Sequence, residues 1–107
     1  MTGDSIDVSA VQEFLRKFAE DRDWAHFHTP KNLAMALAAE TGELLEIFQW
    51  MTPEESARPD GMVKQAVGEE LADILQYLIR LADMLEIDLK SALWHKLRIN
   101  EQRFPGQ

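Results

Sequence analysis

Four carboxylates are spaced in this sequence as metal ligands could be: Glu40 pairs with Glu43, and Glu70 with Asp73. The members of each pair are three residues apart, so on an α-helix their side chains lie on the same side. Apolar residues share those sides: Leu33, Leu37, Leu44 and Ile47 lie within about 60° of Glu40, and Val63, Val67, Ile74, Tyr77 and Leu81 lie within about 60° of Glu70. We therefore expect two helices that each present two acids to one interior.

An interior that contains four ionised carboxylates must be neutralised. Burying one unpaired carboxylate costs several kcal/mol, and close neighbours add repulsion. Protonation or basic partners could neutralise them, but neither apolar face carries Lys or Arg near these acids in the sequence. Carboxylate oxygens without Cys or His suit hard cations. The pattern therefore predicts that Glu40, Glu43, Glu70 and Asp73 bind Mg²⁺, with Mn²⁺ as a substitute.

Aromatic residues follow each acid pair at a helical interval. Trp50 comes seven residues after Glu43, and Tyr77 comes seven after Glu70, an offset that returns to within about 20° of the same face. This arrangement predicts a flat, stackable ligand whose charged end meets the metal, as in a nucleoside triphosphate. The alternative is that both rings are ordinary core residues.

Further candidate ligand-binding residues lie in two other segments. Trp24, Phe27 and His28 add two rings and an imidazole just before the second expected helix, although isolated histidines are usually structural. A basic and polar set shares one face of the last expected helix: Lys96, Asn100 and Arg103. Such a face could contact phosphates, although a solvated basic face is the more ordinary explanation.

Composition limits the class of protein. With 107 residues, 46% of them hydrophobic, we expect one helical domain over 1–107, with flexible ends at 1–8 and 105–107. The absence of Cys excludes disulfides and thiolate chemistry. A net charge of −8 argues against a general nucleic-acid binder. No apolar run reaches the roughly eighteen residues of a membrane span, and residues 1–7 lack signal-peptide features, so we expect a soluble, cytoplasmic protein without a membrane partner.

Cap patterns predict four helices and no strand. Their expected bounds are Ser9 to about Trp24, Thr29 to near Met51, about Met62 to Glu86, and Asp88 to before Pro105. Ser9 with Gln12 has the pattern of a capping box, Thr29 precedes Pro30 as an N-cap, and residues 52–55 show another capping pattern. The expected fold is therefore all-α, a four-helix-type bundle.

The third expected helix is apolar on more than one side. Besides the residues near Glu70, it carries Leu71, Leu75, Leu78, Ile79 and Ala82. A helix with one solvent-exposed face usually carries a single apolar stripe. The other helices of a chain of this length cannot cover all sides of the third helix. We therefore expect burial against a second subunit, in a dimer at least.

The order of these motifs resembles a known family. Glu-x-x-Glu, 26 intervening residues and Glu-x-x-Asp are similar to the signature of the MazG-type all-α nucleoside triphosphate pyrophosphohydrolases. Seven segments closely resemble the dCTP pyrophosphatase branch: Arg22 to Trp24, Phe27-His28, Pro30 to Leu33, Glu40 to Leu44, Phe48 to Trp50, Glu69 to Asp73 and Lys96 to Asn100. The similarity extends from about residue 11 to residue 105.

This resemblance implies Mg²⁺-dependent cleavage between the α- and β-phosphates of a deoxynucleoside triphosphate, dCTP or a modified dCTP. The products would be a monophosphate and pyrophosphate, and the role nucleotide-pool sanitation. Besides the four acids as metal ligands, it implies a set of substrate contacts: Trp24 to His28, Trp50 and Tyr77 around the nucleoside, and Lys96, Asn100 and Arg103 near the phosphates. The family's base pocket is shared between subunits, so a homodimer or a dimer-of-dimers tetramer is implied.

The resemblance does not carry every detail over. Vertebrate members of the branch have a ligand-contacting His where this chain has Leu15, so base preference does not transfer with the rest. By position, Glu43 or Glu46 would orient the attacking water as general base.

Two other classes of protein deserve comparison. A di-iron or di-manganese carboxylate bundle would use Glu-x-x-His motifs, but Glu43 and Asp73 occupy the positions that would hold His. A non-catalytic helical dimerisation module, with its acids facing solvent, is the other alternative. Such a module should show no Mg²⁺-dependent rise in melting temperature.

Overall fold

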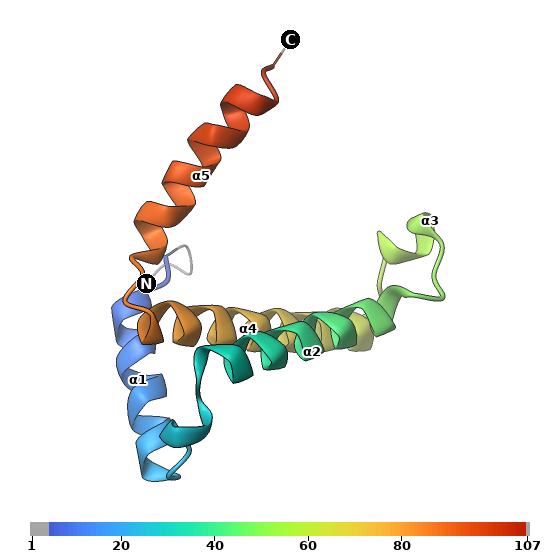
Figure 1. Ribbon diagram of the computed structural model, residues 1–107. Coiled ribbons are helices and arrows are strands. Elements are labelled where there is room, and N and C mark those ends of the chain that lie inside the picture. The colour runs from blue at the N-terminus through green and yellow to red at the C-terminus, as the bar shows by residue number, and fades with distance from the viewer. Residues whose placement is uncertain (1–4, 107) are drawn as a thin grey trace.

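The computed structural model describes residues 5–106, and for these the expected all-α fold is confirmed (Figure 1). The elements in chain order are α1 (Val8–Asp21), the 3₁₀ turn η1 (Ala25–Phe27), α2 (Pro30–Phe48), α3 (Pro53–Ser56), α4 (Gly61–Met84) and α5 (Leu89–Arg103). Of the expected flexible ends, residues 1–4 and 107 lie outside the described range. Among the described helices, none has both the length and the apolar character needed to cross a bilayer.

Helix α1 begins earlier than the sequence pattern predicts. The expected cap, Ser9, is wrong, because Ser9 lies inside the first turn. Asp7 is the N-cap instead, and its Oδ1 accepts a hydrogen bond from the backbone N–H of Ala10 at 3.1 Å. A carboxylate is favoured at this position because it also interacts with the partial positive charge at the start of the helix.

Two helices end earlier than expected because a non-glycine residue after each adopts the left-handed conformation. Asp23 follows α1 and Glu86 follows α4, and both have a φ of 55°. In each case a backbone N–H reaches back five residues over 2.8 Å: from Trp24 to the carbonyl of Ala19, and from Ile87 to the carbonyl of Ala82. This is the Schellman pattern, which closes a helix. The expected ends at Trp24 and Glu86 are therefore wrong by two or three residues.

Caps elsewhere agree with the sequence. Thr29 caps α2, and its hydroxyl accepts a hydrogen bond from the N–H of Asn32 at 3.1 Å. Thr52 and Glu55 form the expected reciprocal capping box at α3, with hydrogen bonds of 2.8 and 3.1 Å. Asp88 caps α5 as expected. These caps satisfy backbone N–H groups that the helices leave without partners.

Helices α2 and α4 lie side by side and run in opposite directions, and α1 packs across the end of α4 (Figure 1). The buried apolar residues of this three-helix region are few: Ala19, Leu33, Ile79 and Ala82. Because α2 and α4 are antiparallel neighbours, the acids in the middle of each helix face the same space.

Helix α5 points away from the other helices (Figure 1). The radius of gyration is accordingly 16.6 Å, whereas a compact domain of this length would have about 13 Å. Large apolar side chains on α5 are exposed, including Leu93, Trp94 and Leu97. The four long helices therefore do not close into a bundle within one chain.

Candidate functional site

Three acids from two helices converge in the structure. Glu40 and Glu43 of α2 and Glu70 of α4 each place one carboxylate oxygen within 4.8 Å of the others. Glu40 and Glu70 are half-buried, and Glu43 is exposed. The antiparallel packing of α2 and α4 thus brings together acids that are about thirty residues apart in the sequence.

This acid trio has no counter-charge within residues 5–106. The Oε2 atoms of Glu40 and Glu70 are buried and lack hydrogen-bond partners, and the ion pairs among the described residues involve other acids. Protonated Glu70 can donate to Glu40, and this interaction, together with burial and the nearby Glu43, raises the pKa of Glu70 to about 7. A set of crowded carboxylate oxygens with unsatisfied lone pairs fits a hard divalent cation.

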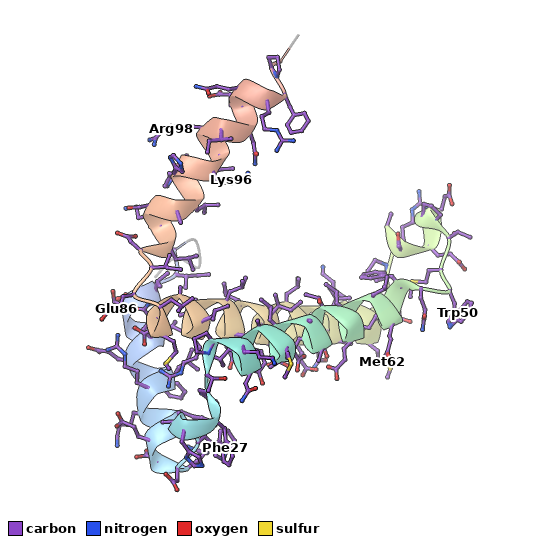
Figure 2. All side chains as sticks on the ribbon, viewed as in Figure 1. Phe27, Trp50, Met62, Glu86, Lys96 and Arg98 are labelled. Atoms are coloured by element: carbon purple, nitrogen blue, oxygen red, sulfur yellow. The ribbon has the colours of Figure 1, made fainter. Side chains whose placement is uncertain are left out.

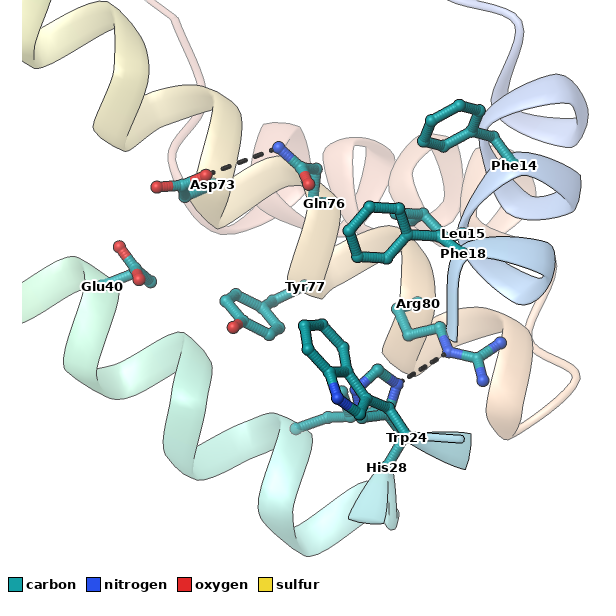
Figure 3. Close-up of a pocket in the computed structure, with 11 residues that line it drawn as sticks. Phe14, Leu15, Phe18, Trp24, His28, Glu40, Asp73, Gln76, Tyr77 and Arg80 are labelled. Atoms are coloured by element: carbon teal, nitrogen blue, oxygen red, sulfur yellow. Dashed lines mark hydrogen bonds between the residues drawn. The ribbon is translucent and has the colours of Figure 1, made fainter. Parts of the chain in front are cut away.

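Asp73, the fourth expected metal ligand, lies next to the trio but not in it. It is one turn further along α4 than Glu70, and it accepts a hydrogen bond from Nε2 of Gln76 at 3.5 Å. Figure 3 shows Asp73 and Glu40 facing each other from α4 and α2. Both line the same pocket, so the acid cluster adjoins the pocket through these two residues.

The pocket has a volume of about 260 Å³ and is walled largely by rings. Its lining comprises Phe14, Leu15, Phe18, Trp24, His28, Leu33, Glu40, Asp73, Gln76, Tyr77 and Arg80. Expected ligand contacts Trp24, His28 and Tyr77 are therefore brought together here (Figure 3). A concave, mostly apolar space with a few polar groups is typical of a small-molecule site.

Contacts between the rings hold one wall of the pocket. Phe18 packs edge-on against Trp24, with ring centroids 5.6 Å apart, and lies 6.1 Å from Phe14. The Trp24 and His28 rings are 6.5 Å apart. Arg22 covers Phe18 from outside, with its guanidinium carbon 3.5 Å from the ring centre. Helix α1 and the turn after it thus form an aromatic wall that α4 faces.

The end of the pocket away from the acids is basic. Arg80 of α4 is buried, with 7% of its surface exposed, and its Nε donates to Nδ1 of His28 at 3.3 Å. Burial, followed by the charge of Arg80, lowers the pKa of His28. The pocket therefore has carboxylates at one end and a guanidinium at the other.

Two expected ligand contacts, Phe27 and Trp50, are not among the residues that line the pocket. Phe27 is 60% exposed and packs on His26, with ring centroids 3.9 Å apart. Trp50 is 89% exposed, because α2 ends at Phe48 and not near Met51 as expected. The helical offset from Glu43 therefore does not apply to Trp50. Pro53 disfavours the helical conformation at Thr52, the residue before it, so the chain turns between α2 and α3.

Three expected phosphate contacts lie on the projecting helix α5. Lys96 and Arg103 are exposed, and Asn100 is half-buried. Figure 2 shows this helix well separated from the end of α1 where Phe27 lies. Within one chain these residues therefore do not reach the pocket. Glu46, an expected base, is exposed on α2 and lies outside the acid trio.

Sequence reasoning missed part of the pocket wall. Phe14, Phe18, Gln76 and Arg80 line the pocket, but none of them was among the expected ligand contacts. A signal existed on α4, because Gln76, Tyr77 and Arg80 follow Asp73 at intervals of three, four and seven residues, the spacing of one helical face. On α1, the interval of four between Phe14 and Phe18 gives the same signal.

Comparisons with known proteins agree on one family. The model of the MazG-like family matches residues 35–107. The chain is 46% identical over 99 residues to dCTP pyrophosphatase 1 of Homo sapiens, a match that covers 90% of this chain and 58% of that protein. The protein of the same name from Mus musculus is 44% identical over 97 residues, with 89% and 57% covered. The chain thus spans a little over half the length of these curated relatives.

A solved structure is similar over the whole chain. The crystal structure of a pyrophosphatase from Archaeoglobus fulgidus matches with a TM-score of 0.87 and 37% sequence identity. The match covers 99% of both chains. The likeness therefore includes the projecting α5.

Proposed function

The chain belongs to the MazG-like family, and on this basis we propose that it is a divalent-cation-dependent nucleoside triphosphate pyrophosphohydrolase. It would cleave a deoxynucleoside triphosphate between the α- and β-phosphates and release a monophosphate and pyrophosphate. dCTP or a modified dCTP is the proposed substrate, because the similar curated proteins are named dCTP pyrophosphatase 1. The proposed role is sanitation of the nucleotide pool in the cytoplasm.

One observation carries this proposal: an acid trio without counter-charge adjoins a ring-lined pocket, which Glu40 of the trio and the nearby Asp73 both line. Phosphates are polyanions, so they require cations between themselves and Glu40, Glu43, Glu70 and Asp73. The nucleoside would then lie between Tyr77 and the aromatic wall. A triphosphate is the kind of ligand that has both a charged tail for the acids and a flat head for the rings.

The proposed mechanism divides roles among the acids. A bound Mg²⁺ would act as Lewis acid toward the phosphate oxygens and the attacking water. Glu40 and Glu70 would be the permanent ligands, which their buried oxygens without partners support. Glu43 is exposed within the trio and is therefore the better placed of the two candidate bases, while Glu46 would act from outside it.

We also propose that the active protein is a homo-oligomer, a homodimer or a dimer-of-dimers tetramer. The single chain exposes 8715 Å², over a third more than the roughly 6,100 Å² expected for a folded monomer of this mass. Exposed leucines on three helices support the proposal: Leu45 on α2, Leu71 on α4 and Leu93 on α5. In such an assembly, Trp50, Lys96, Asn100 and Arg103 would contribute to the pocket of a neighbouring subunit.

Pyrophosphate release from a panel of canonical and modified deoxynucleoside triphosphates tests the proposal. With Mg²⁺ we expect monophosphate and pyrophosphate in equal amounts, with dCTP or a modified dCTP among the best substrates, and with chelator we expect no release. Stepwise release of orthophosphate would contradict the proposed bond cleavage. No turnover of any triphosphate, together with no Mg²⁺ binding, would favour the alternative of a helical dimerisation module.

A further inference from the structure

A buried arginine contacts one edge of His28, and this contact determines where the imidazole carries its proton. The Nε–H of Arg80 lies 3.3 Å from Nδ1 of His28. A guanidinium can only donate hydrogen bonds, so Nδ1 must accept. The single proton of the neutral ring is then on Nε2, and the ring cannot take a second proton without losing the contact.

We infer that Arg80 is a positioning residue that holds His28 as a neutral imidazole with its proton on Nε2, so that the pocket presents a fixed hydrogen-bond donor. Nε2 is on the opposite side of the ring from Arg80, and His28 lines the pocket. Resting on the function proposed above, the ligand of this donor is a nucleobase edge that carries an acceptor, either a carbonyl oxygen or an unprotonated ring nitrogen. The proton position itself does not depend on that function.

The charged groups around His28 are consistent with this assignment. Arg80 from α4 is in contact with the ring, and burial, followed by the charge of Arg80, lowers the pKa of His28. The other charged residues that line the pocket are Glu40 from α2 and Asp73 from α4, while α1 contributes only Phe14, Leu15 and Phe18. Thus no carboxylate is bonded to the imidazole among the described contacts, and nothing there favours its charged form.

A second contact keeps Arg80 in place. Asp83, one turn further along α4, has its Oδ2 3.6 Å from an Nη atom of Arg80. Arg16 of α1 binds the same carboxylate through two hydrogen bonds of 2.6 and 2.7 Å. The side chain of Arg80 is therefore fixed between Asp83 and His28, which a flexible cation on the surface would not be.

Ring ¹⁵N spectra of the full chain, with and without Arg80→Met, test the inference. In the wild type at pH 7.5 we expect the two nitrogens of His28 to differ widely in chemical shift, with the proton on Nε2; the resonances are assigned through a His28→Gln variant. In Arg80→Met the two shifts should converge as the tautomers exchange, and the pKa of His28 should rise. The KM for the best substrate should increase about 3- to 10-fold and gain a pH dependence near pH 6.5, with kcat unchanged.

Lys17→Met is the matched control, because it removes a cation from α1 without touching Asp83, Arg80 or His28. It should leave the ¹⁵N pattern and KM as in the wild type. A proton on Nδ1 in the wild type, or an unchanged His28 pattern in Arg80→Met, would overturn the inference. If Arg80→Met does not fold, a proton on Nδ1 of His28 in the wild type would still overturn the inference. If no triphosphate is hydrolysed, the spectra still test the position of the proton, and only the proposed function fails.

Discussion

The two ends of the pocket balance their charges in opposite ways. Beside the basic end, Arg16 and Arg80 both contact the carboxylate of Asp83, so each of these three side chains has an opposite charge next to it in the same chain. At the acidic end, three carboxylates crowd within 4.8 Å of one another, and two of them bury an oxygen that has no partner. The basic end is complete in the polypeptide, whereas the acidic end requires something that the polypeptide does not supply.

This difference separates a structural charge cluster from a candidate site. A carboxylate that already contacts two guanidinium groups, as Asp83 does, restrains its partners and has little capacity left to bind a ligand. Like charges held together cost stability unless a proton or a bound cation compensates them, and such clusters are common at functional sites. Substitutions at the acidic end and at the basic end should therefore change different properties of the protein, and by different amounts.

The largest effect is expected from removing a trio carboxylate. Glu70→Gln should lower Mg²⁺-dependent pyrophosphate release at least about 100-fold, because it removes a buried ligand oxygen and its charge. Glu69→Gln, the neighbouring exposed acid on α4, is the control and should retain activity. Equal activity in the two variants would remove the acid trio from the mechanism.

The next effect concerns the stability of the metal-free protein. In chelator, the folded state holds a proton on Glu70 up to about pH 7, while the unfolded chain releases it near its ordinary value of 4.5. Stability should therefore fall as pH rises from about 4.5 to 7. At pH 8, Mg²⁺ at 100 times its Kd should raise Tm on the order of 10 °C.

Thermal unfolding across pH, with and without Mg²⁺, measures this effect. Glu69→Gln is again the control and should behave like the wild type, whereas Glu70→Gln should flatten the pH dependence in chelator. A stability that rises between pH 5 and 7 in chelator would contradict the account of the acidic end.

The smallest effect is expected at the basic end. Hydrogen bonding to Arg16 lowers the pKa of Asp83 below its ordinary 3.8, so this pair adds stability at pH above about 4 and loses it as pH falls further. Arg16→Met should lower Tm at pH 7 by a few °C, since Arg16 is half-exposed, and the difference from the wild type should shrink in acid.

Lys17→Met supplies the comparison for this pair, because the Lys17–Asp21 pair of the same helix is well exposed. Its Tm should change little at any pH. A difference between Arg16→Met and the wild type that persists unchanged below pH 3 would show that Asp83 is not its origin.

Local chemistry explains which parts of the fold could be predicted from the sequence. Thr29, Thr52 and Asp88 cap helices through side chains that reach backbone N–H groups three residues away, so each signal is contained in a few residues. The ends after Asp21 and Met84 could not be predicted in this way. These helix ends depend on Asp23 and Glu86, which adopt a left-handed backbone conformation that Gly adopts far more often than other residues.

In the candidate site, too, some features could be predicted from the sequence and others could not. The helical spacing of Glu40, Glu43 and Glu70 predicted that they would share a space, because α2 and α4 are long enough for the periodicity to hold. The contact between Arg80 and His28 joins residues 52 apart, and no local pattern encodes it. No local pattern in residues 89–103 predicts the direction of α5 either.

The small number of buried apolar residues also bears on how the chain folds. Only Ala19, Leu33, Ile79 and Ala82 are buried apolar residues in the described part of the chain. In the proposed assembly, most hydrophobic gain would then arise when subunits meet, so folding and association would be a single concentration-dependent equilibrium. Dilution would lower the midpoint of unfolding, and a separated subunit would have little capacity to keep its own helices together.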